Sequence, residues 1–273
     1  MEKDVVLIAI HGMGETQKDY AEPLWQQLME KLGPALWSRV HYDSIYYQTL
    51  VQPHQQKLWA RMRQRDLDWT RVRQFLLYGF SDAAWLDYKA HEAGSGYEQA
   101  QGLVLRTLAT ARETAGDKPV VVIAQSLGGH VVSNYLWDAQ AGRPTRGIWL
   151  HPPEGLTRAE EAFLRLKRLR YFYTTGCSIP IFVAGFPKEK IIAVATSNRG
   201  YSFRWKNFYD QDDVLGWPLQ PLSDSYRAAV DRDYAINAGG LLRAWNPLSH
   251  TQYWTDREVT DRLADDLRSL IDG

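Results

Sequence analysis

The feature that most constrains the fold is the stretch of residues 120–130, which reads VVVIAQSLGGH. Its five leading apolar residues, three of them valines, are typical of a strand buried on both faces of a parallel sheet. A sharp turn from such a strand into a helix needs small residues two positions before and after its centre, because helix and strand pack together there. Ala124 and Gly128 stand at these positions around Ser126. The pattern places the Ser126 hydroxyl near a helix N-terminus, where free N–H groups stabilise negative charge.

Strand and helix patterns alternate along the 273 residues. Residues 48–95 instead combine helical periodicity with many aromatic side chains and arginines. We therefore predict one α/β domain over residues 1–273, with a mostly parallel central sheet, helices on both faces, and a helical insertion or cap-like segment at 48–95. The predicted strands are 5–10, 40–47, 119–124, 146–150, 169–175, 203–209 and 234–238. The predicted helices are 24–32, ending at Gly33-Pro34, then 97–115, 127–138 and a last one near 259–271.

The composition excludes several classes of protein. An apolar fraction of 45% is ample for a buried core. The 32 basic and 32 acidic residues cancel, so no long-range field would gather nucleic acid, and we expect no such partner. The single cysteine, Cys177, excludes an intramolecular disulfide and a cysteine-built metal site. No apolar window reaches a membrane-spanning length, so we expect a soluble, cytoplasmic protein.

Two other segments provide partners for Ser126. The first is HGMG (residues 11–14) after the first strand, where the Met13 N–H could pair with that of Leu127 as an oxyanion hole. An ordinary glycine turn is the alternative, and a phosphate loop fits worse because the third glycine of the dinucleotide fingerprint is absent.

The second segment lies near the end of the chain. A serine nucleophile needs a histidine base and an acid, and in this fold class the three follow one another in the order serine, acid, histidine. His250 is the only one of the seven histidines that follows the late cluster of aspartates at 210–213. An aspartate after a late strand can accept the histidine N–H, fix its tautomer and stabilise the imidazolium. We rank Asp213 first, Asp212 second and Asp210 third. The alternatives are a surface-loop histidine and a Ser126 that only caps its helix.

These segments carry a family resemblance. HGMG, AQSLGG around Ser126, DVLGWPL from Asp213 and the SHTQYW loop together resemble the α/β-hydrolase superfamily, and within it lipase and esterase relatives. The family has a glycine two residues before the serine, where this chain has Ala124. The segment 175–180, TGCSIP, resembles a Thr-x-Gly-x-Pro-like strand end of lipases, but Ile179 interrupts the match. In the family, the acid precedes two apolar residues and a Tyr/Trp-Pro pair, which favours Asp213.

The resemblance implies a serine hydrolase that cleaves a carboxylic ester through an acyl-enzyme, with a small-molecule ester or lipid-like substrate. Ser126 would be the nucleophile, His250 the base and Asp213 the acid, with the Met13 and Leu127 amides as oxyanion hole. No metal or organic cofactor is needed. A thioesterase, an amidase or an acyltransferase would use the same triad. A non-catalytic hydrolase-like domain could instead bind a partner or a small ligand through the aromatic insertion.

Three further features have simpler interpretations. A basic run interleaved with Trp59 and Trp69 could contact anionic lipid or an acidic substrate. It consists of Arg61, Arg63, Arg65, Arg71 and Arg73. We favour a solvated helix face. His130, one helical turn after Ser126, is predicted to be structural, and Cys177 is predicted to be a small buried residue.

Overall fold

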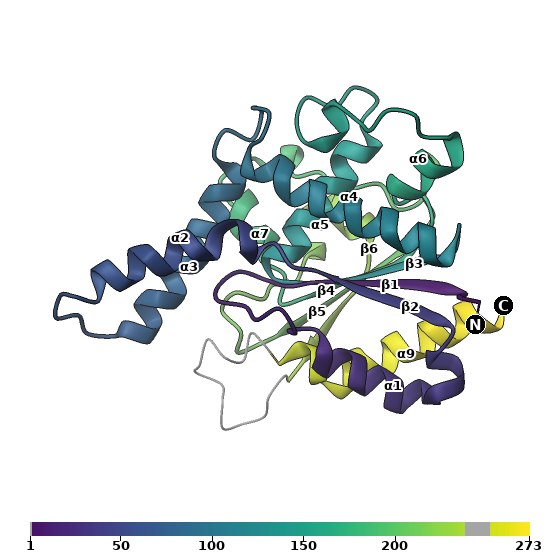
Figure 1. Ribbon diagram of the computed structural model, residues 1–273, viewed down its shortest axis with the longest axis horizontal. Coiled ribbons are helices and arrows are strands. Elements are labelled where there is room, and N and C mark those ends of the chain that lie inside the picture. Colours follow the sequence, from purple (N-terminus) through teal and green to yellow (C-terminus); the bar gives the residue numbers. More distant parts are fainter. Residues whose placement is uncertain (1, 238–251) are drawn as a thin grey trace.

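The computed structural model describes residues 2–237 and 252–273. Its described part contains one six-stranded sheet with the order β2-β1-β3-β4-β5-β6, and every neighbouring pair is parallel (Figure 1). The strands are β1 Val5–Ile10, β2 Val40–Ile45, β3 Val120–Gln125, β4 Leu169–Thr175, β5 Arg204–Asp210 and β6 Val230–Ile236. Because all six strands run the same way, their carboxyl ends meet at one edge of the sheet.

Helices cover both faces of this sheet, which confirms the predicted fold class (Figure 1). Alternate residues of a strand point to opposite faces, and β1 shows this division. Val6 and Ile8 belong to the core beneath α4 (Gly96–Ala115) and α5 (Leu127–Gln140). Val5 and Leu7 belong to the core beneath α1 (Glu22–Trp37) and α9 (Arg257–Asp272). Strands buried on both faces need the continuous apolar runs seen in the sequence. The shorter helices are α6 Arg158–Leu164, α7 Ile179–Val183 and α8 Asp224–Ala229.

One predicted strand is wrong. Residues 146–150 contain a short 3-10 helix, Ile148–Leu150, because Gly147 has φ 72° and turns the chain. The Ile148 N–H bonds to the Gln101 side chain at 3.0 Å, so it is not available to a strand neighbour. The last strand, β6, starts four residues before the predicted 234–238. The first helix breaks at Gly33 (φ 76°), as predicted, but helical geometry resumes after the break and extends to Trp37.

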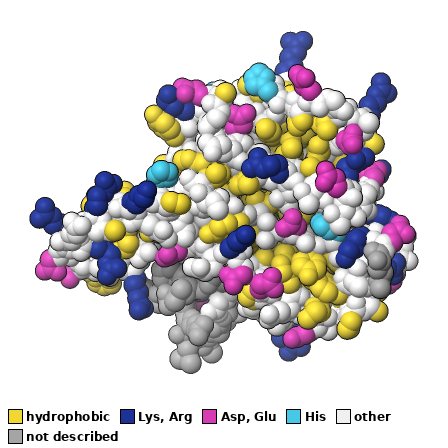
Figure 2. All heavy atoms as spheres, in the orientation of Figure 1, with side chains coloured by type: hydrophobic (Ala, Val, Ile, Leu, Met, Phe, Trp, Pro, Cys, Tyr) yellow, Lys and Arg dark blue, Asp and Glu magenta, His cyan; other side chains and the backbone are white. Residues whose placement is uncertain are grey.

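The insertion is helical, as predicted, and forms an arm of two helices, α2 (Gln48–Met62) and α3 (Thr70–Asp87), that projects from the domain (Figure 1). Within the described residues, no helix combines the length and apolar character needed to cross a membrane. Basic side chains predominate among the charges on the visible face of the arm (Figure 2). The exposed basic residues of the arm are Lys57, Arg61, Arg63, Arg65, Arg71 and Arg73.

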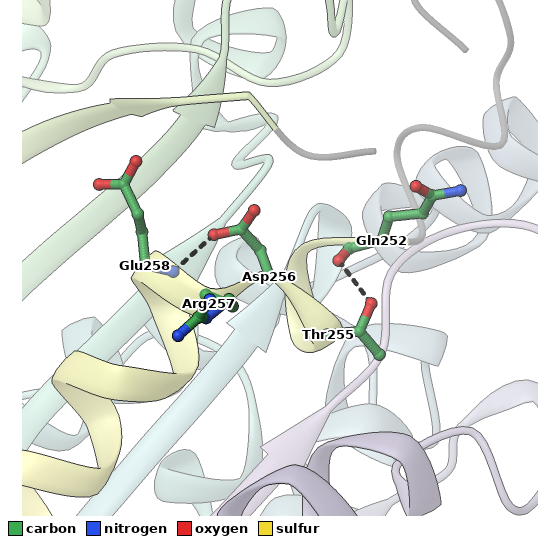
Figure 3. Close-up of a pocket in the computed structure, with 5 residues that line it drawn as sticks. All are labelled: Gln252, Thr255, Asp256, Arg257 and Glu258. Carbon is green, nitrogen blue, oxygen red and sulfur yellow. Dashed lines mark hydrogen bonds between the residues drawn. The ribbon is translucent and has the colours of Figure 1, made fainter. Parts of the chain in front are cut away.

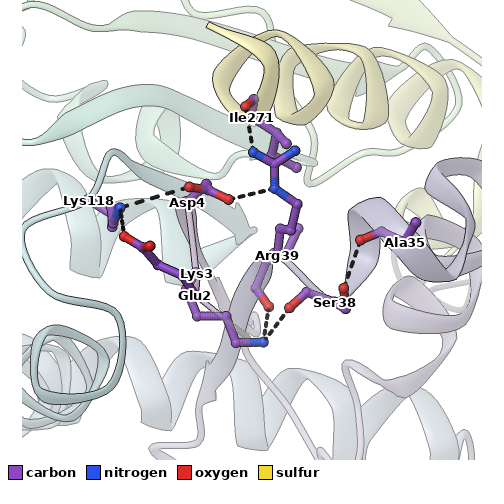
Figure 4. Close-up of polar contacts among 9 residues, drawn as sticks. Glu2, Lys3, Asp4, Ala35, Ser38, Arg39, Lys118 and Ile271 are labelled. Atoms are coloured by element: carbon purple, nitrogen blue, oxygen red, sulfur yellow. Dashed lines mark hydrogen bonds and ion pairs between the residues drawn. The ribbon is translucent and has the colours of Figure 1, made fainter.

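Polar contacts fasten the amino ends of β1 and β2 (Figure 4). Arg39 pairs with Asp4 at 2.7 Å and donates to the carbonyl of Ile271 in α9 at 3.1 Å. Lys3 donates to the carbonyl of Val40 at 3.0 Å. These contacts join both ends of the chain at one edge of the sheet, opposite the carboxyl ends of the strands.

Candidate active site

Ser126 lies at the carboxyl end of the sheet, between β3 and α5. Its backbone has φ 50° and ψ −120°, a conformation that residues with a side chain rarely adopt. Such strain costs about 1–3 kcal/mol and persists where the surrounding structure enforces it. One contact that holds the turn is the Ser126 N–H, which donates to the carbonyl of Thr175 at the end of β4 at 2.9 Å.

Glycines let the neighbouring backbone approach this turn. A Cβ on Gly128 would lie 2.5 Å from the His11 carbonyl oxygen, so the sequence argument for a small residue here is confirmed. A Cβ on Gly12 would lie 2.7 Å from the Ser126 Cβ and 3.4 Å from its Oγ. The HGMG segment therefore passes directly beside the serine, and its role as an oxyanion loop stays a prediction.

The Ser126 side chain is fully buried. Within residues 2–237 and 252–273, its Oγ has no hydrogen-bond partner. Buried hydroxyls are nearly always hydrogen-bonded, and leaving one unpaired costs about 1–3 kcal/mol. A strained backbone and an unpaired buried hydroxyl both count against the simple helix-cap interpretation, because a capping serine would bond to its own helix.

The three candidate acids differ in their surroundings. Asp212 is exposed, whereas Asp213 and Asp210 are 6% and 3% exposed. Asp213 accepts from the Tyr253 hydroxyl at 2.8 Å and from the Leu215 N–H at 3.0 Å. The Asp210 N–H donates to the same tyrosine oxygen at 2.9 Å. Burial, followed by the charge of Asp213, raises the pKa of Tyr253, so this phenol stays protonated and donates to Asp213.

Segments from three regions of the sequence meet around Thr175. Its carbonyl accepts from the Ser126 N–H, and its hydroxyl accepts from the Trp254 Nε1–H at 3.2 Å. The neighbouring Tyr253 contacts Asp213. Tyr253 and Trp254 thus contact both the loop that carries Asp213 and Thr175, the residue that is bonded to the serine turn.

The loop after β5, which carries the three candidate acids, is held by side chains of β5 and β6. Asn207 in β5 donates to the Trp217 carbonyl at 2.9 Å and to Asp233 in β6 at 2.8 Å. Asp233 in turn accepts the N–H groups of Leu219 and Gln220. This network holds the end of the loop that carries Asp213.

The HGMG loop has its own buried contacts. The His11 Nδ1 lies 2.7 Å from the Gly12 carbonyl oxygen, and its Nε2 accepts from the Tyr47 N–H at 3.2 Å. The ring also stacks on Tyr47, with centroids 4.1 Å apart. Burial lowers the pKa of His11 to about 4, and the bond to Gly12 opposes this shift. His11 is therefore neutral, with its proton on Nδ1.

Other sequence predictions have mixed outcomes. His130 stacks on Phe182 at 4.2 Å and lies 3.0 Å from the Asn134 side chain, which is a packing role. Cys177 is fully buried, as predicted. His250 lies outside the described residues, so its place in the site stays a prediction. Thr175 and Tyr253, which join these segments, are absent from the predicted site, although both stand inside segments that carry the family resemblance.

A hollow of about 330 Å³ lies beside the start of α9 (Figure 3). Its polar groups already serve the helix end, because Asp256 accepts the Glu258 N–H at 2.8 Å and Thr255 donates to the Gln252 carbonyl at 3.1 Å. The lining contains no residue of the Ser126 turn. Among the described residues, no group of three or more His, Cys, Asp or Glu side chains could hold a metal ion.

No model of a known protein family matches the chain, and no curated protein matches it. Several solved structures are similar. A hydrolase of the alpha/beta superfamily from Xanthomonas campestris pv. campestris is 14% identical, with 97% of this chain and 98% of that one covered and a TM-score of 0.43. Est1E from Butyrivibrio proteoclasticus is 12% identical, with 100% and 90% covered and a TM-score of 0.46. A lipase/esterase from Lactobacillus plantarum is 14% identical, with 98% and 87% covered and a TM-score of 0.43. Each of these likenesses covers nearly the whole of this chain at 12–14% identity.

Proposed function

We propose that the protein is a serine hydrolase that cleaves carboxylic esters, with Ser126 as nucleophile. The observation that carries this proposal is the strained, buried Ser126 at the end of β3, whose Oγ has no partner among the described residues. A hydroxyl held in this way is pre-positioned for attack on a bound carbonyl carbon.

His250 is the proposed general base. Its position in the chain is three residues before Tyr253, and three residues of chain span at most about 11 Å. Tyr253 contacts Asp213 and Trp254 contacts Thr175, and these contacts of residues that closely follow His250 in the sequence support its assignment as the base. Asp213 would accept the histidine N–H, fix the tautomer and stabilise the imidazolium.

The proposed reaction has two halves. His250 removes the Ser126 proton as the Oγ attacks the ester carbonyl, and the Met13 and Leu127 N–H groups stabilise the oxyanion. The carbonyl re-forms, the alcohol leaves with the proton from His250, and Ser126 carries the acyl group. Water then attacks with the same base, which releases the acid and the free serine. The small-molecule or lipid-like nature of the ester is part of this proposal.

A panel of p-nitrophenyl esters of graded acyl length tests the proposal. Wild type should hydrolyse at least one ester, and Ser126→Ala should lose at least about 10⁴-fold in kcat. A fluorophosphonate probe should label wild type and not this variant. Labelling that persists in Ser126→Ala would contradict the assignment of the nucleophile.

The acid is tested with a matched pair of variants. Asp213→Asn should lower kcat by on the order of 10³–10⁴-fold, because the asparagine favours the wrong histidine tautomer. Asp212→Asn, one residue away and exposed, should change kcat less than about two-fold. The reverse order of effects would move the acid to Asp212.

A further inference from the structure

We infer that Tyr47 and Asp82 are positioning residues that fix the direction of the Met13 N–H, the proposed oxyanion donor. The inference rests on the proposed function and deepens it, because it names two residues outside the triad on which that function depends. The two peptide units on either side of Met13 are each held by a buried side chain.

The first peptide unit joins Gly12 to Met13. Its carbonyl oxygen accepts from the Tyr47 hydroxyl at 2.7 Å and lies 2.7 Å from the protonated His11 Nδ1. Tyr47 is fully buried and His11 is 2% exposed. A trans peptide unit is planar, and its C=O and N–H point in opposite directions. Two donors that fix the Gly12 carbonyl therefore also fix the direction of the Met13 N–H.

The second peptide unit joins Met13 to Gly14. The Gly14 N–H donates to the Asp82 Oδ2 at 2.8 Å. By the same planarity, the Met13 carbonyl must point away from Asp82. Gly14 has φ 95°, a backbone conformation that glycine adopts without steric cost. The loop can thus turn sharply here and keep both peptide units in place.

Asp82 is itself held by the arm. It is fully buried in α3, and it accepts from Gln48 Nε2 at 2.9 Å and from Gln55 Nε2 at 2.5 Å, both in α2. The backbone N–H of Gly14 is the third donor. Three N–H donors can satisfy a buried carboxylate, which would be costly without them.

The Met13 side chain adds a packing contact to the same helix. A Cβ on Gly79 in α3 would lie 2.7 Å from the Met13 Sδ. The arm therefore contacts the oxyanion loop twice, through the Asp82 carboxylate and through the flat surface at Gly79. This arrangement makes the arm a support for the proposed oxyanion donor.

Tyr47→Phe and Asp82→Asn test the inference, with Tyr88→Phe and Asp87→Asn as controls on exposed residues of the same types. Each variant is measured for kcat and KM on the best p-nitrophenyl ester, and for inhibition by a trifluoromethyl ketone with the same acyl chain. Each test variant should lose about 10-fold in kcat with little change in KM, because a misdirected donor weakens transition-state stabilisation. Ketone affinity should fall by the same factor as kcat/KM, because the ketone forms an oxyanion on the serine. The controls should stay within about two-fold of wild type.

Several results would overturn the inference. One is a folded Tyr47→Phe variant with wild-type kcat, and another is a loss of activity with unchanged ketone affinity. If Asp82→Asn fails to fold, Tyr47→Phe decides, since it removes a single hydroxyl. A wild-type protein that hydrolyses no ester and is not labelled at Ser126 would refute the proposed function, and the inference with it. An active wild type with unaffected variants would refute the inference alone.

Discussion

His11 should make the fold lose stability as the pH falls through mildly acidic values. In the unfolded chain the imidazole binds a proton near pH 6.5, whereas burial lowers the pKa in the folded protein to about 4. The geometry agrees, because a second proton would have to displace the Tyr47 N–H from Nε2. Between these two pKa values the unfolded state binds more protons than the folded state. The free energy of unfolding therefore decreases as the pH is lowered. The loss starts near pH 6.5 and is complete below about pH 4.

The magnitude follows from the two pKa values. Between pH 7.5 and pH 5, His11 alone should lower the free energy of unfolding by about 2 kcal/mol. Urea unfolding of wild type and His11→Gln at both pH values isolates this contribution, because the other histidines are common to both proteins. Wild type should lose about 2 kcal/mol more than the variant over this interval. The proton resonances of the His11 ring should also stay unshifted down to about pH 5. A ring that titrates near pH 6.5, or equal losses in both proteins, would refute the reasoning.

Three other changes have definite expected outcomes. Gly12→Ala puts a methyl group 2.7 Å from the Cβ of the proposed nucleophile and should lower kcat about 100-fold, as measured by ester hydrolysis, with the fold intact by circular dichroism. Lys206→Met breaks a largely buried pair with Asp266 (2.5 Å) and should cost about 3 kcal/mol in urea unfolding, whereas Arg204→Met at an exposed pair should cost less than about 1 kcal/mol. Equal costs would contradict this. Burial raises the pKa of the Cys177 thiol to about 12, so a thiol reagent should modify it only after unfolding; fast modification of the native protein would be inconsistent with the core.

The parts of the fold that the sequence predicts well are those with a strong local cause. β1 and β3 are buried on both faces, so they need the continuous apolar runs that the sequence shows at these positions. The serine turn is also readable locally, because the apolar strand, the small residues around Ser126 and the following helix are all consecutive in the sequence. The close contact that Gly128 makes with the His11 carbonyl is consistent with the small residue at that position.

The missed features depend on distant parts of the chain. Residues 146–150 have strand-like composition, but a hydrogen bond from Ile148 to Gln101, 47 positions away, replaces strand pairing. The bond between Gly14 and Asp82 joins positions 68 apart, and no local pattern signals it. The burial of Asp213 and its contact with Tyr253 are likewise not encoded in the local sequence, so the three late aspartates could only be ranked. The roles of Asp213 and His250 stay predictions, and His250 lies outside the described residues.

The fastening at the amino edge of the sheet has a practical consequence. Arg39 pairs with Asp4 near one end of the chain and donates to the Ile271 carbonyl near the other (Figure 4). The two ends of the chain therefore lie close together. A purification tag, a fluorophore or a surface linker attached at either end would sit across the sheet from Ser126. Immobilised through either end, the molecule would therefore present its serine-bearing edge to the solution, and a short peptide bridge between the ends could relocate the termini elsewhere.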